Sequence, residues 1–151
     1  MSTVQPTERG SMTTTEHNKQ IVTAFITALF TEGDLTAVDR YLHPDFRNHD
    51  APLPGASDGP DGMRMAAETF RKAFPDWHSD AHHLIAEGDL VAEHFTARGT
   101  HQGSALGEEP TGGQVALHGI NIFRVADGKI VERWGVLDQL SLLTQLGVTH
   151  Q

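Results

Sequence analysis

Apolar residues recur at helical spacing along the first half of the chain. Between Glu16 and Thr31 they predict an amphipathic helix, with an apolar side made of Ile21, Val22, Phe25, Ile26, Leu29 and Phe30. Leu35 to Leu42 and Asp61 to Phe74 show the same spacing, and Pro44 and Pro75 follow their ends. Because proline cannot continue a helix, the first half predicts three helices that each bury one side.

The second half alternates between apolar and polar residues with the period of two that marks β-strands. Strands are predicted over Trp77 to Ala86 and Leu90 to Thr100, joined by the turn Glu87-Gly88-Asp89. Two more strands flank Asp127-Gly128, a pair typical of a tight hairpin because such turns need positive φ. Three helices followed by strands predict an α+β fold. We expect a curved, mixed or antiparallel sheet wrapped around the helices as a cone.

The hairpin carries the most informative residues. If its turn is two residues long, Phe123 lies opposite Glu132 and Asn121 lies opposite Trp134. Alternation then places these side chains, and Asp138, on one face of the sheet. That face mixes aromatic surface with a few polar groups, which favours the wall of a ligand cavity. The alternative is a half-exposed sheet whose acidic side chains are solvated.

Composition restricts the partners and the chemistry. The chain has 151 residues, no cysteine and a formal net charge of −9. The charge argues against nucleic acid or an anionic membrane as partner, and the lack of cysteine excludes disulfides and thiol nucleophiles. Residues 1–14 are polar and predict a flexible tail before a single domain over residues 15–151. Without a secretory leader or a transmembrane run, we expect a cytoplasmic protein.

Ten histidines invite a metal hypothesis, which the spacing does not favour. His82 and His83 are adjacent on a predicted strand, so they are expected to point to opposite faces. The predicted helices carry no His-x-x-x-His or Glu-x-x-His pattern. We therefore expect no metal ion. His118 alternates to the face opposite Asn121, so it is expected outside the sheet or at an interface.

Short segments between residues 17 and 147 occur together in a specific order. They are Tyr41 to His49, Ala73 to Asp76, Glu87 to Asp89, Gly99 to Gly103, Pro110 to Gly112, Gly128 to Asp138 and Leu142 to Gly147. Together they resemble the SnoaL-like polyketide cyclase family, within the nuclear transport factor 2-like superfamily. The resemblance implies a cone with a deep pocket, assembly as a dimer or tetramer, and ring closure by intramolecular aldol condensation without metal or cofactor.

The resemblance also shows two departures from the cyclases. Their catalytic aspartate would fall on Gly135, and their helper histidine would fall near Asn121. Neither of these side chains takes up a proton. Because the chain still resembles the cyclases at Asn48 and along the hairpin, the acid–base group is expected elsewhere.

Glu132 is the predicted base. A carboxylate in an apolar pocket is desolvated, so its pKa rises toward the working pH, and the hairpin pattern places Glu132 on the cavity face. The alternative is that Glu132 pairs with an arginine such as Arg124 or Arg133 as part of the structure.

Other residues are predicted to assist. Asp138 is a second candidate acid, although an N-cap of a closing helix over Leu140 to Leu146 is the favoured alternative. His49 enters the proline-rich loop and is a candidate proton carrier. Hydrogen bonds to a substrate carbonyl are predicted from Asn48, Asn121 and Tyr41, and flat apolar contact from Trp134, Phe123 and Phe25.

These features predict a cofactor-free enzyme that acts on a hydrophobic, polyketide-like or other carbonyl-bearing small molecule. The expected reaction is a cyclisation driven by enolisation. The same scaffold also supports hydroxylases, dehydratases, isomerases and epoxide hydrolases. A non-catalytic binding or assembly module would be favoured if Glu132 and Asp138 were exposed or salt-bridged with no enclosed pocket between them. A homodimer, or a tetramer, is expected from the resemblance and from the exposed face of the sheet.

Overall fold

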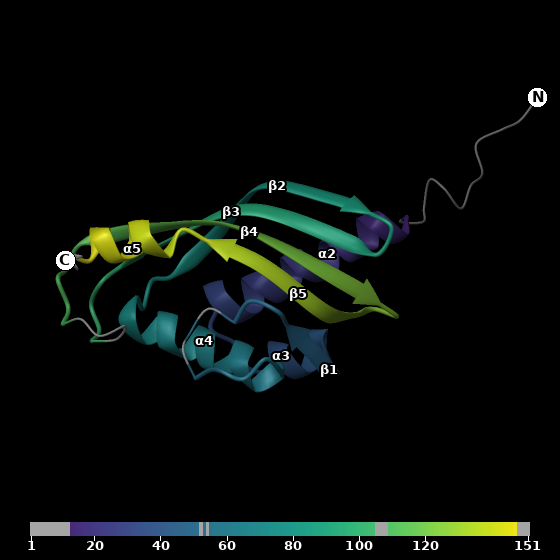
Figure 1. The fold of residues 1–151 in the computed structure, drawn as a ribbon, viewed down its shortest axis with the longest axis horizontal. Helices are drawn as coiled ribbons and strands as arrows, with labels where there is room; N and C mark the ends of the chain where they lie inside the picture. The colour runs from purple at the N-terminus through teal and green to yellow at the C-terminus, as the bar shows by residue number, and fades with distance from the viewer. Residues whose placement is uncertain (1–12, 52, 54, 105–108, 148–151) are drawn as a thin grey trace, which may run out of the picture.

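The computed structural model describes residues 13–51, 53, 55–104 and 109–147. Five strands form one sheet in the order β1-β5-β4-β3-β2 (Figure 1). The strands are β1 (Leu42–Asn48), β2 (His78–Glu87), β3 (Leu90–Thr100), β4 (Gln114–Ala126) and β5 (Lys129–Leu137). The helices are α2 (Thr14–Ile26), continued by a π-helical turn over Thr27–Thr31, α3 (Ala37–Tyr41), α4 (Pro60–Ala73) and α5 (Gln139–Gln145).

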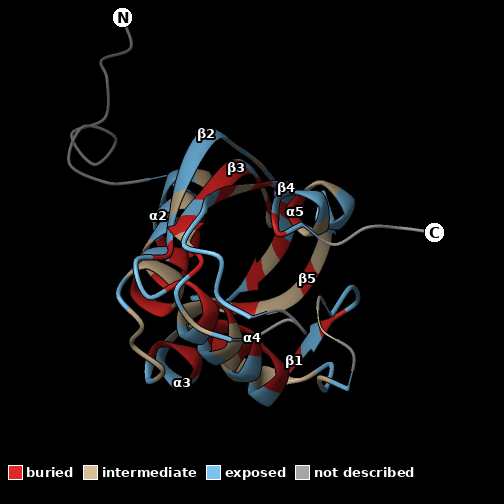
Figure 2. Ribbon diagram, turned by 90° about the vertical axis from the view of Figure 1, so that its left-hand side faces the viewer, coloured by how far each residue is buried: buried red, intermediate tan, exposed pale blue. Residues whose placement is uncertain are grey.

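The predicted α+β fold is confirmed. Strand β1 runs parallel to β5, and the other neighbouring strands are antiparallel. The sheet curls over helices α2 and α4, which lie against its concave side (Figure 2). Apolar side chains of the helices and the inward residues of the strands form two clusters there, one around Phe25 and Phe123 and one around Phe74 and Trp77.

Helix α2 begins earlier than the sequence pattern indicates. Its first residue is Thr14, and the hydroxyl of Thr13 accepts a hydrogen bond from the backbone N–H of Glu16 at 3.2 Å. This side-chain cap satisfies one of the free N–H groups at the helix start, so the end of the predicted tail belongs to the helix. Residues 1–12 of that tail lie outside the described residues. No helix in the described part of the chain is long and apolar enough to cross a membrane.

The hairpin between β4 and β5 has the predicted two-residue turn but not the predicted register. Asp127 and Gly128 both have positive φ, and Val125 pairs with Ile130 as expected. Beyond this point the pairing shifts by one residue, because Val131 is an extra residue in β5 and forms a β-bulge. The bulge therefore reverses the face on which every later residue of β5 lies.

The predicted common face for the hairpin is accordingly wrong in its β5 half. Phe123 pairs with Arg133, and Asn121 pairs with Gly135. Glu132 and Trp134, which were expected beside Phe123 and Asn121, lie on the convex face instead. After the bulge, Arg133 and the residues in phase with it lie on the concave face of β5.

A second irregularity corrects the expectation for the adjacent histidines. The β2–β3 register shifts between Ala81 and His83, which makes His82 the extra residue. His83 pairs with His94, and the His82 ring contacts the Thr96 hydroxyl, so both histidines lie on the convex face. The described residues include no group of three or more metal-binding side chains placed to hold an ion.

One prediction about the fold concerns Gln102 and Gly103, whose backbone contacts the C-terminal end of α4. The N–H groups of Gln102 and Gly103 both donate to the carbonyl of Ala73 at 3.0 Å. A Cβ on Gly103 would lie 1.9 Å from the carbonyl oxygen of Lys72. We expect Gly103→Ala to lower the free energy of unfolding by about 2–4 kcal/mol, because backbone atoms must move. Urea unfolding measures this change.

The control is Gly113→Ala, where the nearest atom to the added Cβ is the Thr111 hydroxyl at 3.4 Å. Its unfolding midpoint should stay close to that of the unmodified chain. Equal stability of the two variants would contradict the proposed backbone contact.

Candidate functional site

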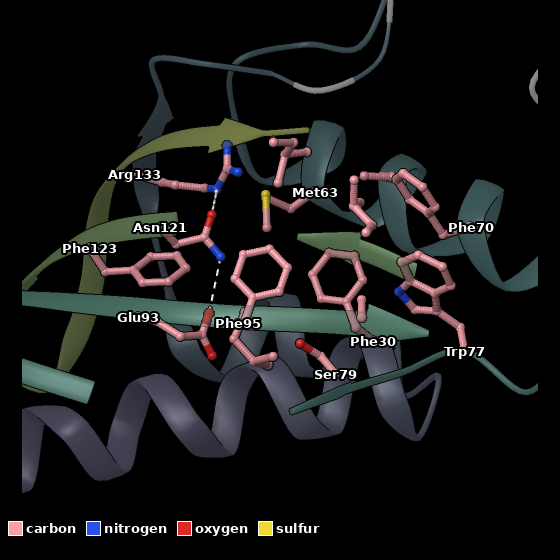
Figure 3. Close-up of a pocket in the computed structure, with 15 residues that line it drawn as sticks. Phe30, Met63, Phe70, Trp77, Ser79, Glu93, Phe95, Asn121, Phe123 and Arg133 are labelled. Atoms are coloured by element: carbon pink, nitrogen blue, oxygen red, sulfur yellow. Dashed lines mark hydrogen bonds between the residues drawn. The ribbon is translucent and has the colours of Figure 1, made fainter. Parts of the chain in front are cut away.

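A cavity lies between the concave face of the sheet, the end of α2 and helix α4 (Figure 3). Its space free of protein atoms, the open mouth included, is about 560 Å³. Aromatic rings dominate its wall, namely Phe30, Phe70, Trp77, Phe95 and Phe123. Four polar side chains face it, namely Ser79, Glu93, Asn121 and Arg133. Such a combination of apolar wall and few polar groups is typical of small-molecule sites.

Glu93 is the only carboxylate that lines this cavity among the described residues. It lies on β3 in phase with Val91 and Phe95 and is 3% exposed. One carboxylate oxygen, Oε1, accepts a hydrogen bond from Asn121 Nδ2 at 3.1 Å, and within the described part of the chain Oε2 accepts none. Burial raises the pKa of the Glu93 carboxyl, although Asn121 and Arg133 favour its charged form.

Sequence reasoning missed Glu93, although the signal was present. Alternation along Val91, Glu93, Phe95 and Ala97 places a single acid in a row of inward apolar residues. An ionisable group in such a row is a candidate functional group, because desolvation perturbs its pKa.

Arg133 is the second buried ionisable group of the cavity. Its Nε donates to Asn121 Oδ1 at 3.0 Å, and its Nη1 donates to Asn48 Oδ1 at 2.9 Å and to the Asp50 carbonyl at 2.8 Å. All three acceptors are neutral, and Nη2 has no hydrogen bond to the residues that the structure describes. Burial lowers the pKa of Arg133 to about 10, against the attraction of Asp50 and Glu93. The guanidinium is therefore still a cation at neutral pH.

These side chains form a continuous chain across three strands. Arg133 on β5 bonds to Asn121 on β4, which bonds to Glu93 on β3 (Figure 3). Asn121 thus uses its carbonyl oxygen for the cation and its amide nitrogen for the acid. This bridge keeps the two charges in one cavity without a direct ion pair.

Gly135 makes room for the guanidinium. A Cβ at this position would lie 2.2 Å from Arg133 Nη2, 2.6 Å from Arg133 Cζ and 2.9 Å from Asn121 Oδ1. The backbone N–H of Gly135 donates to Asp50 Oδ2 at 2.9 Å. At the position where the resemblance places the aspartate of the cyclases, the side-chain space is thus filled by Arg133.

The residues predicted to bind substrate do not all line the cavity. Asn121 and Phe123 line the cavity. Asn48 does not line it, but it is 3% exposed and holds the Arg133 guanidinium. Phe25 and Tyr41 are packed behind the wall, where Phe25 meets both Phe123 and Tyr41 edge-on, with ring centroids 6.3 and 6.2 Å apart.

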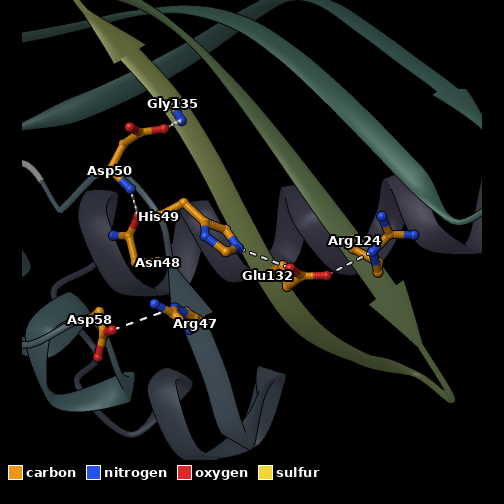
Figure 4. Close-up of polar contacts among 8 residues, drawn as sticks. All are labelled: Arg47, Asn48, His49, Asp50, Asp58, Arg124, Glu132 and Gly135. Carbon is orange, nitrogen blue, oxygen red and sulfur yellow. Dashed lines mark hydrogen bonds and ion pairs between the residues drawn. The ribbon is translucent and has the colours of Figure 1, made fainter.

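Glu132, His49 and Trp134 lie together on the convex side of β5, away from the cavity. Glu132 accepts hydrogen bonds from His49 Nε2 and from Arg124 Nε, both at 2.8 Å (Figure 4). The His49 ring stacks on Trp134 with centroids 4.8 Å apart. The bonds from His49 and Arg124 lower the pKa of Glu132. The predicted placement of Glu132 and Trp134 on the cavity face is wrong, and a catalytic role for Glu132 or His49 stays a prediction.

Asp138 takes the structural role that was the favoured alternative. It is the N-cap of α5, and its side chain accepts a hydrogen bond from the Ser141 N–H at 3.0 Å. The side chain is exposed. Its predicted part in catalysis is likewise untested by this placement.

The fold agrees with comparisons to known proteins. The sequence profile of the SnoaL-like polyketide cyclases matches residues 20–146, so the chain belongs to the SnoaL-like polyketide cyclase family. The nogalonic acid methyl ester cyclase of Streptomyces nogalater is 29% identical over 119 residues, which cover 78% of this chain and 89% of that protein.

Solved structures show the same relationship. TsrD from Streptomyces laurentii superposes with a TM-score of 0.77 at 31% identity, covering 88% of this chain and 96% of that one. AclR from Streptomyces galilaeus, a proposed hydroxylase, gives 0.76 at 31% identity, covering 91% and 89%. IdmH from Streptomyces antibioticus, a proposed polyketide cyclase, gives 0.74 at 31% identity, covering 87% and 99%.

The contact between Gly135 and Arg133 leads to a prediction. We expect Gly135→Ala to push the guanidinium out of its hydrogen bonds and to lower the free energy of unfolding by about 1–3 kcal/mol, because buried polar groups lose their partners. Gly59→Ala is the control, since a Cβ there meets nothing within 4 Å. Urea unfolding of both variants measures the difference, and an unchanged midpoint for Gly135→Ala would contradict the proposed packing.

The charge of Glu93 leads to a second prediction. A carboxyl whose pKa is raised in the folded state destabilises the fold at pH values above the pKa that the same carboxyl has in the unfolded chain. At such pH values the unfolded state gives up the proton more readily than the folded state does. We expect Glu93→Gln to be more stable than the unmodified chain at about pH 8. This advantage should shrink as the pH falls to about 4, where the carboxyl is largely protonated in both states.

Glu132→Gln is the matched control, and its expected change in stability at the higher pH has the opposite sign. The lowered pKa of Glu132 stabilises the fold above the ordinary carboxyl pKa, and this contribution is lost as the pH falls through the lowered value. The variant should therefore be less stable than the unmodified chain at about pH 8. Unfolding midpoints at the two pH values distinguish the carboxyls, and a Glu93→Gln variant that is less stable at the higher pH would contradict our view of Glu93.

Proposed function

We propose that the chain is an acid–base enzyme that cyclises a hydrophobic, polyketide-like carbonyl compound by intramolecular aldol addition, without metal or cofactor. The observation that carries the proposal is the free oxygen of the buried Glu93 carboxylate. It faces an aromatic cavity that also holds the cation of Arg133. Family membership and the curated cyclase relative support the reaction class.

Glu93 is the proposed base. An enolisation needs a positioned base whose pKa lies near the working pH, and burial shifts Glu93 in that direction. Its Oε2 takes a proton from the carbon beside a substrate carbonyl, and the electron pair forms an enolate. The enolate carbon then attacks a second carbonyl of the same molecule, and the resulting alkoxide takes the proton back from Glu93.

Arg133 is proposed to stabilise the enolate oxygen. A cation fixed before the reaction begins is effective in a cavity that excludes water, because little reorganisation is needed as charge develops. Three neutral acceptors hold the guanidinium and leave Nη2 available. Asn48 and Asn121 therefore act in this proposal by positioning Arg133 and Glu93, and Phe123 contributes flat apolar surface for the substrate.

This arrangement accounts for the departure at Gly135. A carboxylate there would enter the space of the Arg133 guanidinium. We propose that the acid–base group has moved from β5 to Glu93 on β3, and that Arg133 fills the position left by the aspartate. The catalytic roles predicted for Glu132, Asp138 and His49 have no place in this mechanism, because their side chains lie outside the cavity.

Hydroxylation is the second candidate function. AclR, a proposed hydroxylase, resembles the chain about as closely as the cyclase relatives do. In that reaction the carbon of an enolate formed by Glu93 would attack dioxygen to give a hydroperoxide, and an external two-electron reductant such as a thiol would reduce the hydroperoxide to the alcohol and water. The product mass separates the two reactions, since aldol addition leaves the mass unchanged and hydroxylation adds one oxygen atom.

A non-catalytic binding module is less well supported. Its predicted signature is met in part, because Asp138 is exposed and Glu132 is held by Arg124 and His49. However, the cavity on the opposite face contains a buried acid and a buried cation. A binding module for a neutral apolar ligand has no need of either group, since burying both is unfavourable.

The experiment is mass spectrometry of purified protein incubated with anthraquinone-type keto esters and simpler β-keto compounds. We expect a product of unchanged mass, formed about 10²–10⁴-fold more slowly by Glu93→Gln, which keeps the hydrogen-bonding shape but not the base. Glu132→Gln is the matched control and should keep turnover close to normal. The reverse result, with loss of turnover in Glu132→Gln alone, would return the base to the convex face and refute the proposal.

A further inference from the structure

The cavity has a polar half and an aromatic half. The polar half holds the side chains proposed for the reaction, namely Glu93, Asn121 and Arg133. The aromatic half is defined by Phe30, Phe70, Trp77 and Ser79. Ser79 on β2 pairs with Ala97, four residues along β3 from Glu93, and the two sets lie in different halves of the cavity (Figure 3). A ligand that fills the cavity therefore meets both.

Among the described residues that line the cavity, Ser79 carries the only hydroxyl group. Its backbone N–H donates to Thr31 Oγ1 at 3.2 Å, but its own Oγ has no hydrogen bond to any residue that the structure describes. A serine hydroxyl can both donate and accept a hydrogen bond. A ligand that covers this hydroxyl without bonding to it loses free energy, so Ser79 favours a ligand with an oxygen at this place.

Phe30 lies on the π-helical turn that continues helix α2. This turn spans Thr27–Thr31, and the N–H of Glu32 donates to the Thr27 carbonyl at 2.9 Å. Turns of this kind are rare and often occur at functional sites. The end of a helix leaves its last carbonyl groups without partners inside the helix. In this chain a side chain from α4 supplies the partner for the carbonyls of Phe30 and Thr31.

Arg71 is that side chain, and it joins the turn to the segment that carries Trp77. Its Nη1 donates to three backbone carbonyl oxygens, those of Phe30 at 2.9 Å, Thr31 at 2.8 Å and Trp77 at 3.1 Å. One guanidinium thus fixes the backbone beside two of the aromatic rings. Because the Thr31 hydroxyl accepts the bond from the Ser79 N–H, the same turn also holds Ser79.

The aromatic half is consequently ordered before a ligand binds. Gly33 leaves room for the guanidinium, since a Cβ there would lie 2.6 Å from Arg71 Nε. Trp77 is buried, and its ring stacks on Phe70 with centroids 5.0 Å apart. Groups that are ordered in advance lose little conformational freedom on binding. A ligand oxygen beside Ser79 therefore gains most of the free energy of the hydrogen bond.

We propose that Ser79 selects ligands that carry a second oxygen on a flat ring, and that Arg71 is the positioning residue that holds Ser79 and the aromatic rings in place. The inference rests on the function proposed for the cavity, because the first oxygen is the carbonyl that meets Arg133. The second oxygen is a hydroxyl or carbonyl bonded to Ser79 Oγ, on a ring in contact with Phe30 and Trp77. A ring of the same shape without this oxygen leaves the Ser79 hydroxyl unpaired.

The test is isothermal titration calorimetry of the full chain with two probes, 2,6-dihydroxynaphthalene and 2-naphthol. Both are flat and present one hydroxyl to the polar half, but only the first has a second hydroxyl at its other end. We expect the dihydroxy probe to bind about three- to tenfold more tightly, the range for one neutral hydrogen bond. Ser79→Ala should bring the two affinities close together and leave that for 2-naphthol nearly unchanged. Equal affinities in the unmodified chain, no binding of either probe, or a preference that survives Ser79→Ala overturns the proposal.

Two arginine variants test the positioning role. Arg71→Lys keeps the positive charge but loses the fork that reaches several carbonyls, so it should reduce the preference for the dihydroxy probe. Arg64→Lys is the matched control on the same helix and should keep the preference, since the Arg64 guanidinium is paired with the exposed carboxylates of Asp39 and Asp61. An unfolded fraction of the protein affects both probes equally, so a loss of stability alone leaves the ratio of dissociation constants unchanged. An unchanged ratio in Arg71→Lys overturns the positioning role.

Glu93→Gln separates this inference from the proposed function. The variant should lose turnover but keep the preference between the probes, because Ser79 and Arg71 are unchanged. A preference without turnover in the unmodified chain would refute the proposed reaction and leave the inference standing. Turnover without the preference would refute the inference and leave the reaction standing.

Discussion

The guanidinium of Arg133 is a cation held inside an apolar wall by three neutral oxygens. Burying a charge without an ion pair is unfavourable, and the lowered pKa of Arg133 reflects this. Several features around the cavity follow from this cation. The side-chain oxygens of Asn48 and Asn121 and the backbone carbonyl of Asp50 accept its hydrogen bonds. Gly135 leaves the space that the guanidinium occupies. Glu93 supplies a negative charge in the same cavity without touching the cation.

One backbone irregularity makes this arrangement possible. The bulge at Val131 turns Arg133 toward the cavity and Glu132 toward the convex face. The two faces consequently differ in chemistry. The concave face has buried groups whose pKa values are shifted by burial, whereas Glu132 on the convex face has a pKa lowered by its hydrogen bonds. The bulge thus separates the buried ionisable groups of the cavity from the hydrogen-bonded Glu132 on the other face.

Most elements of the fold were predictable from the sequence, because helical and strand periodicity, the turn at Asp127-Gly128 and the prolines all act locally. Strand β1 and its parallel pairing with β5 were not among them. The site was less predictable. An inserted residue such as Val131 leaves no clear mark in an alternating pattern, yet it exchanges the faces of Glu132 and Arg133. Glu93 could have been found by alternation alone. The role of Gly135 could not be predicted, because the side chain that fills its space is that of Arg133, two residues earlier on β5. The course of that side chain is known only from the structure.

The central claim is that Glu93 is a buried carboxyl poised to accept a proton beside a cation. The most direct measurement is the titration of its side-chain carboxyl carbon by nuclear magnetic resonance, with the signal assigned by its loss in Glu93→Gln. The account predicts a midpoint above those of the exposed glutamates. A midpoint at or below theirs would show that Glu93 stays ionised like a solvated acid, and would contradict the mechanism built on it.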